Sequence, residues 1–217
     1  CGSVDKYCPA GSETPLVVPD GYYSGPVDAS EPTRSEKTIC PAGYYCVGGE
    51  KHPCPAGSLG EAEGQRNPTC DGQCPRGYYC VGGEKFECGS VDKYCPAGSS
   101  APTNVTTGHY SGPSDVNENV RYEETLCPVG YYCVGGEKFE CASGYFGNST
   151  GLTTSQCSGM CKDGYYCESG STRDDQHECG SVDKYCPAGS ETPLVVPDGY
   201  YSGPEDASET TRSEKTI

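Results

Sequence analysis

Eighteen cysteines supply the thiols with which this 217-residue chain could bind a metal, attack a substrate or form disulfides. Zinc sites and thiol redox enzymes typically use Cys-x-x-Cys pairs, whereas the short cysteine spacings here leave three, five, six or seven residues between neighbours. The three histidines, His52, His109 and His177, stand at unrelated places in the cysteine pattern. We therefore expect no zinc site, no redox-active dithiol and no Cys–His nucleophile.

The carboxylates give no stronger sign of a reactive site. Asp174 and Asp175 fall in a short insertion, where no buried pocket is implied that would shift their pKa values. The run Asp-x-Asn-x-Asn at 115–119 resembles the start of a calcium loop, but Val120 and Leu126 stand where the glycine and the closing glutamate are needed. We predict that the protein is not an enzyme and has no catalytic residue, cofactor or metal site, with weak calcium binding between acidic repeats as the one alternative.

The cysteines are better explained as structural, because the apolar residues are too few for a conventional core. Leu, Ile, Val and Phe make up roughly an eighth of the chain, below the fifth or so at which strongly charged sequences are disordered. A disulfide that closes a loop of about 15 residues contributes on the order of 3 kcal/mol, so four in each repeat can replace a core. Disulfides persist in oxidising compartments, which predicts an extracellular or cell-surface protein.

A tandem repeat organises the chain. Residues 1–39 return at 179–217 with two changes, Val27 to Glu205 and Pro32 to Thr210, and a weaker copy begins at Cys88. Self-similarity at a fixed period is the signature of a repeat architecture, so we predict repeats at 1–87 and 88–178 and a partial repeat at 179–217. The pattern is already under way at the first residue and breaks off where a cysteine is due, so we expect a longer repetitive protein.

Glycine and proline stand at fixed places in the repeat and predict its turns. Pro-Ala-Gly and Gly-Gly mark turns, and Gly-Gly lies between short Tyr-rich runs that can pair as two-stranded ribbons. No stretch shows helical periodicity over 11 residues. The predicted fold class is therefore small disulfide-rich repeats, in an elongated array of short β-ribbons and loops with little or no helix.

Six Tyr-Tyr pairs recur in the extended segments. Neighbouring side chains in a strand point to opposite faces, so one ring can cover a disulfide while the other faces solvent or another chain. Regularly spaced spare rings are candidates for lateral contacts between chains. The twelve interface candidates are Tyr22, Tyr23, Tyr44, Tyr45, Tyr78, Tyr79, Tyr131, Tyr132, Tyr165, Tyr166, Tyr200 and Tyr201.

The net charge and the glycosylation sequons limit the kinds of molecule that this chain is expected to bind or carry. The net charge of −16 argues against nucleic acid and anionic membranes, which both need a basic face. No apolar run approaches 18 residues, so we expect no membrane contact within this chain. The sequons that begin at Asn104 and Asn148 predict N-linked glycans at both residues.

The motifs CPAGYYC and CPAGS…C resemble the cysteine-rich repeats called ephrin-receptor-like and, more distantly, tumour-necrosis-factor-receptor modules. The resemblance covers essentially the whole chain. It implies elongated ladders of disulfide-bonded units, as in ectodomains and in giant extracellular proteins of protists. In the receptor module the first cysteine of such a loop closes on the one that ends it, which implies the pairs Cys54–Cys70 and Cys141–Cys157. The partner of Cys88 stays open between Cys80 and Cys95.

Two functions fit this sequence. The first is a structural subunit of an extracellular glycosylated filament or surface appendage, such as a flagellar hair (mastigoneme), whose partners are copies of itself or other filament chains. The alternative is the stalk or ligand-binding ectodomain of a receptor or adhesin. The match of 37 residues in 39 favours the filament, because a polymer requires equivalent surfaces at each repeat and a receptor with one ligand does not.

Overall fold

The computed structural model describes residues 1–26 and 33–217, and the strands in this part form twelve two-stranded sheets. Each strand has two to four residues. Helical structure is confined, in the described residues, to isolated 3-10 segments such as η2 (Glu118–Val120). The prediction of small disulfide-rich repeats made of short β-ribbons with little helix is confirmed.

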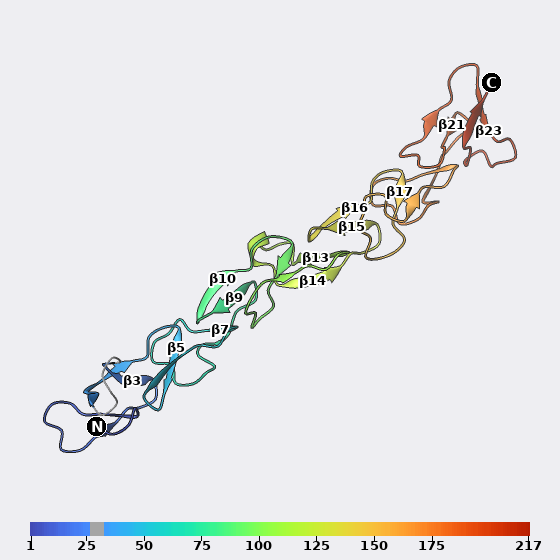
Figure 1. The fold of residues 1–217 in the computed structure, drawn as a ribbon. Helices are drawn as coiled ribbons and strands as arrows, with labels where there is room; N and C mark the ends of the chain where they lie inside the picture. Colours follow the sequence, from blue (N-terminus) through green and yellow to red (C-terminus); the bar gives the residue numbers. More distant parts are fainter. Residues whose placement is uncertain (27–32) are drawn as a thin grey trace. The chain divides into compact units, whose positions relative to one another are not determined.

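The chain divides into two compact units, Cys1–Asn104 with Gly112–Glu123 and Val105–Ser111 with Glu124–Ile217 (Figure 1). In the first unit the hairpins are β1–β2 (Lys6–Tyr7, Leu16–Val17), β3–β4 (Tyr22–Gly25, Glu36–Ile39), β5–β6 (Tyr44–Val47, Glu50–Pro53), β7–β8 (Ser58–Leu59, Gly72–Gln73), β9–β10 (Tyr78–Val81, Glu84–Glu87) and β11–β12 (Lys93–Tyr94, Thr103–Asn104).

In the second unit they are β15–β16 (Tyr131–Val134, Glu137–Glu140), β17–β18 (Tyr145–Phe146, Gly159–Met160), β19–β20 (Tyr165–Tyr166, His177–Glu178), β21–β22 (Lys184–Tyr185, Leu194–Val195) and β23–β24 (Tyr201–Gly203, Glu214–Thr216). The division between the units passes through the remaining described pair, β13 (His109–Gly112) and β14 (Glu123–Leu126). The repeat limits expected at 87/88 and 178/179 are limits of sequence similarity and stay a prediction.

The hairpin β5–β6 shows why the recurring sequence Tyr-Tyr-Cys-Val-Gly-Gly-Glu-Lys folds as it does. Its two-residue turn, Gly48-Gly49, has φ of +59° and +79°. Positive φ at both turn positions matches the twist of the flanking strands and is accessible to glycine at little cost. Aromatic and β-branched residues on the first strand favour the extended backbone. The same turn recurs at 82–83 and 135–136.

Sulfur takes the place of a conventional core. The buried apolar side chains of the described residues are fourteen cysteines and Val18, each 3% exposed or less. All 18 cysteines form disulfides, and each bond closes a loop with a sequence separation of 6, 7 or 16 residues. Closing loops of this size removes about 2 to 3 kcal/mol of unfolded-chain entropy each in the loop-closure model.

The nine pairs are Cys1–Cys8, Cys40–Cys46, Cys54–Cys70, Cys74–Cys80, Cys88–Cys95, Cys127–Cys133, Cys141–Cys157, Cys161–Cys167 and Cys179–Cys186. Cys88 is therefore bonded to Cys95, while Cys80 is bonded to Cys74. Because every bond is local in sequence, the disulfides fix single hairpins and loops. Contacts between successive hairpins must then come from backbone hydrogen bonds and side chains.

Candidate functional site

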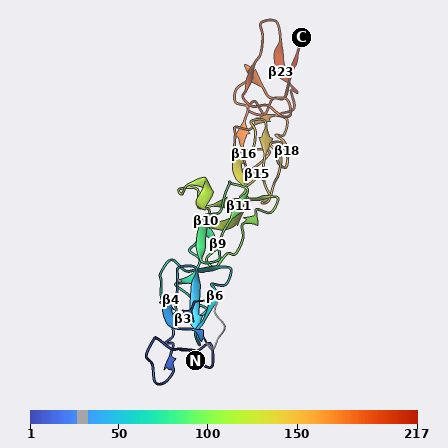
Figure 2. The ribbon, with the colours of Figure 1, turned by 60° about the vertical axis from the view of Figure 1, so that its left-hand side comes forward.

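The best-defined recurring site is the joint between one hairpin and the next. In the first unit β3 lies against β5–β6, as the ribbon shows (Figure 2). The Ser24 N–H donates to the Gly49 carbonyl oxygen at 3.0 Å, and Tyr23 and Gly49 form a parallel β-bridge. The Gly21 N–H donates to the Cys46 carbonyl oxygen at 2.9 Å. We call this arrangement the Ser–Gly joint.

Close backbone approach makes glycine necessary at the turn of this joint. A Cβ on Gly49 would lie 2.8 Å from the carbonyl carbon of Val4 and 2.9 Å from the Cα of Asp5. Real Cβ atoms essentially never come within 3.0 Å of backbone atoms. The neighbouring Gly48 has nothing within 4 Å of its Cβ position, so the steric demand falls on Gly49 alone.

A lysine ties the two hairpins together through aromatic rings. The Nζ atom of Lys51 lies 5.4 Å from the ring centroid of Tyr23 and 4.6 Å from that of Tyr44. Cation–π contacts of this length contribute about 0.5 to 1 kcal/mol at exposed sites. On the same hairpin Tyr45 stacks on His52, with ring centroids 5.2 Å apart.

The Ser–Gly joint recurs one repeat later, within the second unit. The Ser111 N–H donates to the Gly136 carbonyl oxygen at 2.9 Å, and Tyr110 forms the parallel bridge to Gly136. Lys138 Nζ lies 5.1 Å from the Tyr110 ring and 4.9 Å from the Tyr131 ring. The serine hydrogen bond, the turn glycine and the lysine–tyrosine contacts of the joint therefore all recur with the sequence repeat.

Most of the predicted interface tyrosines have partners in their own chain. The first five Tyr-Tyr pairs are half-buried, and only the last, Tyr200 and Tyr201, is exposed, at 42% and 47%. In three of these pairs the second tyrosine stacks on an aromatic residue of the opposite strand: Tyr79 on Phe86, Tyr132 on Phe139 and Tyr166 on His177. More of these tyrosine rings pack within their own chain than the sequence analysis expected. Lateral contacts between chains stay a prediction.

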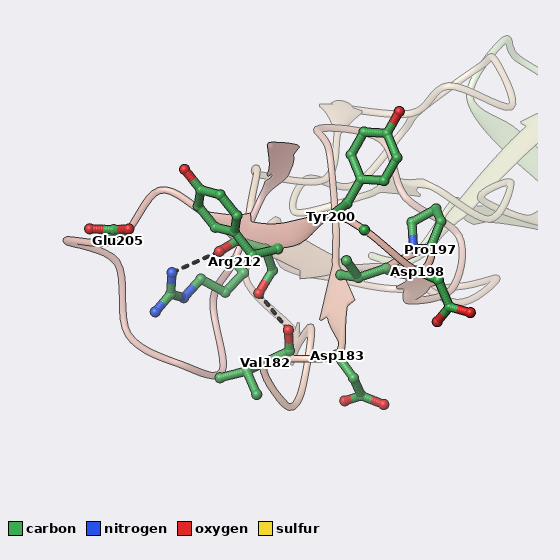
Figure 3. Close-up of a pocket in the computed structure, with 11 residues that line it drawn as sticks. Val182, Asp183, Pro197, Asp198, Tyr200, Glu205 and Arg212 are labelled. Atoms are coloured by element: carbon green, nitrogen blue, oxygen red, sulfur yellow. Dashed lines mark hydrogen bonds between the residues drawn. The ribbon is translucent and has the colours of Figure 1, made fainter. Parts of the chain in front are cut away.

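The exposed pair belongs to a cavity of about 800 Å³ beside β23, which we call the terminal cavity (Figure 3). The Ser202 hydroxyl donates to the Val182 carbonyl oxygen at 2.6 Å, and Arg212 donates to the Ser202 carbonyl oxygen at 2.9 Å. Tyr200 and Tyr201 also line the cavity. Glu205, one of the two positions that differ between the near-identical copies, stands at its edge.

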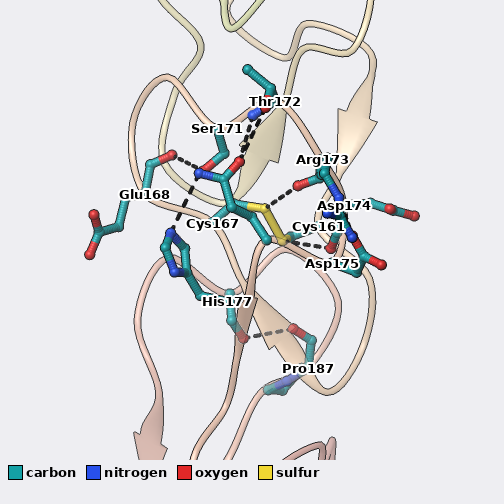
Figure 4. Close-up of a disulfide and its surroundings, with 12 residues drawn as sticks. Cys161, Cys167, Glu168, Ser171, Thr172, Arg173, Asp174, Asp175, His177 and Pro187 are labelled. Atoms are coloured by element: carbon teal, nitrogen blue, oxygen red, sulfur yellow. Dashed lines mark hydrogen bonds and ion pairs between the residues drawn. A yellow bond between two sulfur atoms is a disulfide. The ribbon is translucent and has the colours of Figure 1, made fainter.

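The four-residue insertion folds back onto a disulfide. Figure 4 shows residues 168–178 around Cys161–Cys167, whose sulfur atoms lie 3.0 Å and 3.4 Å from the carbonyl oxygens of Asp174 and Arg173. Arg173 forms an ion pair with Asp175 at 2.7 Å. Asp174 and Asp175 are half-buried and belong to this loop's own packing.

Both predicted glycosylation residues are accessible. Asn104 lies at the end of β12 and Asn148 follows β17, and both side chains are exposed. Thr106 and Thr150, which complete the two sequons, are exposed as well. Transfer of a glycan requires an accessible surface asparagine, so the structure accommodates modification at both residues, which stays a prediction.

The calcium-like run has a local structural role. The side chain of Asn117 accepts a hydrogen bond of 2.9 Å from the Asn119 N–H and caps the 3-10 turn η2. Within residues 1–26 and 33–217, no group of three or more His, Cys, Asp or Glu side chains could hold a metal ion. In the same residues no helix has the length and apolar character needed to cross a membrane.

Two ionisable groups have shifted pKa values, and both lie at the surface. A hydrogen bond and ion pair with Glu61, at 2.8 Å, raise the pKa of Lys85. A hydrogen bond from the Ser181 hydroxyl lowers the pKa of Asp183. Neither shift arises from a buried group of the kind that catalysis uses.

The two pairs that the receptor-module resemblance implied, Cys54–Cys70 and Cys141–Cys157, are both disulfides in the structure. Sequence reasoning did not find the Ser–Gly joint, because much of the sequence recurs with the repeat and recurrence alone does not show that Ser24 contacts Gly49. No family model matches this chain, and no curated protein is significantly similar to it. The structure itself shows tandem cysteine-rich hairpins closed by disulfides, whose number indicates an oxidising environment such as the cell exterior.

Proposed function

We propose that this chain is a structural, non-catalytic segment of an extracellular N-glycosylated filament or surface appendage. The observation that supports it is the recurrence of the Ser–Gly joint, at Ser24–Gly49 and again at Ser111–Gly136. A joint that follows the sequence repeat offers the same surface each time, and stacked repeats contact mainly their sequence neighbours. A head-to-tail contact repeated in this way generates open arrays when its rotation does not close.

The resemblance to ephrin-receptor-like repeats extends this proposal to the kind of filament. Flagellar hairs (mastigonemes) and surface fibres of protists are the settings that this resemblance suggests. The partners would be copies of this chain or other filament chains, with no nucleic acid and no membrane. Glycans at Asn104 and Asn148, together with the net charge of −16, would keep the surface hydrated.

Electron microscopy of native material in negative stain tests the proposal. We expect uniform filaments with a regular repeat. Isolated rods or globules would contradict it and leave the stalk or ligand-binding ectodomain of a receptor or adhesin as the better reading. Solution scattering adds a second measurement, since an elongated array predicts a radius of gyration well above the roughly 17 Å of a compact 217-residue globule.

A further inference from the structure

Part of the terminal cavity corresponds to a surface that the next hairpin contacts in the first copy of the repeat. Val182, Tyr201 and Ser202 are the counterparts of Val4, Tyr23 and Ser24. In the first copy those residues contact the Gly-Gly turn of β5–β6, through the Ser24–Gly49 hydrogen bond and the Tyr23–Gly49 bridge. The two copies are identical at 37 of 39 positions, so the cavity keeps the groups that receive the turn.

Burial of corresponding residues differs between residues 1–39 and residues 179–217. Val18 is 3% exposed, whereas its counterpart Val196 is half-buried. Gly21 is buried, with the Gly64 carbonyl oxygen 2.6 Å from its Cβ position, and its counterpart Gly199 is exposed. Tyr201 is 47% exposed where the corresponding ring in the first copy is half-buried. Apolar and aromatic surface that is buried in one copy and open in the other is typical of an interaction site.

We propose that the terminal cavity is a docking site for one kind of partner, a disulfide-closed hairpin of the sequence Cys-Pro-x-Gly-Tyr-Tyr-Cys-Val-Gly-Gly-Glu-Lys, as formed by Cys40–Lys51. The partner's second turn glycine lies against the Val182 backbone, and its carbonyl oxygen accepts a hydrogen bond from the Ser202 N–H. Residues 1–39 make these contacts with Gly49. The repeat that begins at Cys88 makes the same serine hydrogen bond, between the Ser111 N–H and the Gly136 carbonyl oxygen.

The side chains that line the cavity fit the lysine of this hairpin. In both covered copies a lysine lies over the tyrosine that precedes the joint serine, at 5.4 Å for Tyr23 and 5.1 Å for Tyr110. The corresponding ring in the cavity is Tyr201, which is exposed. Carboxylates of Asp183, Asp198 and Glu205 also line the cavity and outnumber the one arginine, so its charge favours a cationic side chain.

A chain extended in register provides the test. Ile217 corresponds to Ile39, which Cys40 follows, so a second copy of residues 40–53 is fused after Ile217 in the full chain. Fusion is needed because an isolated two-stranded hairpin is marginally stable in water, and a short link raises its effective concentration. Hydrogen exchange of the Ser202 amide is measured with and without the extension. We expect exchange to slow about tenfold or more, as for an amide hydrogen-bonded inside a folded joint.

The matched control is the same extended chain with Gly49→Asn in the appended copy, because asparagine tolerates positive φ, while the original residues 40–53 stay unchanged. We expect Ser202 to exchange as in the parent chain and Ser24 to remain protected as an internal reference. An extended chain with no free thiol and an unprotected Ser202 would overturn the proposal. Equal protection in the asparagine variant would also overturn it, because docking would then not involve the turn. The outcome is independent of whether native material forms filaments, so this docking site and the proposed function can fail separately.

Discussion

Residues 1–39 and 179–217 carry nearly the same sequence in two different surroundings. Their own bonds are the same: Cys8 N–H to Arg34 carbonyl oxygen is 3.0 Å in the first, and Cys186 N–H to Arg212 is 2.9 Å in the last. The disulfide Cys1–Cys8 has its counterpart in Cys179–Cys186. Neither set of contacts involves the following hairpin.

What differs is burial, since the first copy is covered by β5–β6 and the last is open at the terminal cavity. The comparison therefore separates two levels of stabilisation. Each copy folds locally by its disulfides, turns and short backbone bonds. Some of its side chains, such as Val18 and Tyr23, are less exposed in the copy where the next hairpin forms the Ser–Gly joint. In such arrays stability is a sum of repeat and neighbour terms, and the two copies differ in the second.

Reduction of the disulfides is expected to have the largest effect and to unfold both copies, because each copy depends on its own disulfide. Each disulfide contributes about 2 to 3 kcal/mol in the loop-closure model, and nine together exceed the 5 to 15 kcal/mol net stability of ordinary domains. We expect loss of β structure in circular dichroism on treatment with reductant. Alkylation with reductant should label 18 thiols, and without reductant none; persistence of native structure after full labelling would contradict the disulfide core.

The next largest effect is expected at the turn of the covered joint. Gly49→Asn should destabilise the chain by about 2 to 3 kcal/mol, since the new Cβ overlaps the backbone of Val4. Gly48→Asn is the matched control, because asparagine tolerates positive φ and nothing lies within 4 Å of that Cβ position. Urea unfolding measures both variants, and exchange of the Ser24 amide should accelerate in the first alone. Equal destabilisation would show that turn strain, and not the joint, requires Gly49.

The sequence predicted the features that are local. Gly-Gly between Tyr-rich runs sets the register of β5–β6 completely, because a two-residue turn leaves a single pairing. The loop from Cys54 to Cys70 could be paired through its resemblance to a receptor module. Cys88 could not, since both candidate loops, to Cys80 and to Cys95, are short enough to close.

The sequence could not predict how one hairpin meets the next. The Ser24–Gly49 bond joins backbone atoms 25 residues apart, and neither residue type has a pattern that identifies such a contact. The pairing of β3 with β4 was also unforeseen, because the loop between them is too long for its turn to fix a register. The contacts of Lys51 with Tyr23 and Tyr44 depend on how the two hairpins pack, so the charge of the lysine alone could not predict them.

Chemical modification of tyrosine compares the two copies directly. Tetranitromethane should nitrate Tyr201 several-fold faster than Tyr23, because the former is 47% exposed and lacks the covering lysine hairpin among the described residues. The two tryptic peptides are distinguished by Val27 in the first copy and Glu205 in the last. Equal rates would mean that the joint over Tyr23 opens freely in solution.

A smaller effect is expected for the lysines. Lys51→Met should cost about 0.5 to 1 kcal/mol through the lost contacts with Tyr23 and Tyr44, measured by urea unfolding at low and high salt. Lys6→Met is the control, since Lys6 pairs with Val17 in β1–β2 and lies outside the joint. A loss of the same size in both variants would assign the effect to general charge and not to the aromatic contacts.

The smallest effect concerns the pH dependence of stability, through Asp183 at the edge of the open copy. The Ser181 hydroxyl lowers the pKa of Asp183 chiefly by hydrogen bonding to the ionised carboxylate, while partial desolvation opposes it. A carboxyl with a lower pKa in the folded chain stabilises that chain above its unfolded pKa of about 3.9, and this contribution is lost as pH falls through the folded pKa. Ser181→Ala should therefore raise the pKa of Asp183 toward its usual value, as followed by the NMR signal of its carboxyl carbon. The fall in thermal midpoint between pH 5 and pH 2 should shrink slightly in this variant. Because Asp183 also lines the terminal cavity, a lysine that docks there when residues 40–53 are fused after Ile217 should lower the pKa of Asp183 further. An unchanged pKa on fusion would show that the lysine does not approach this carboxylate.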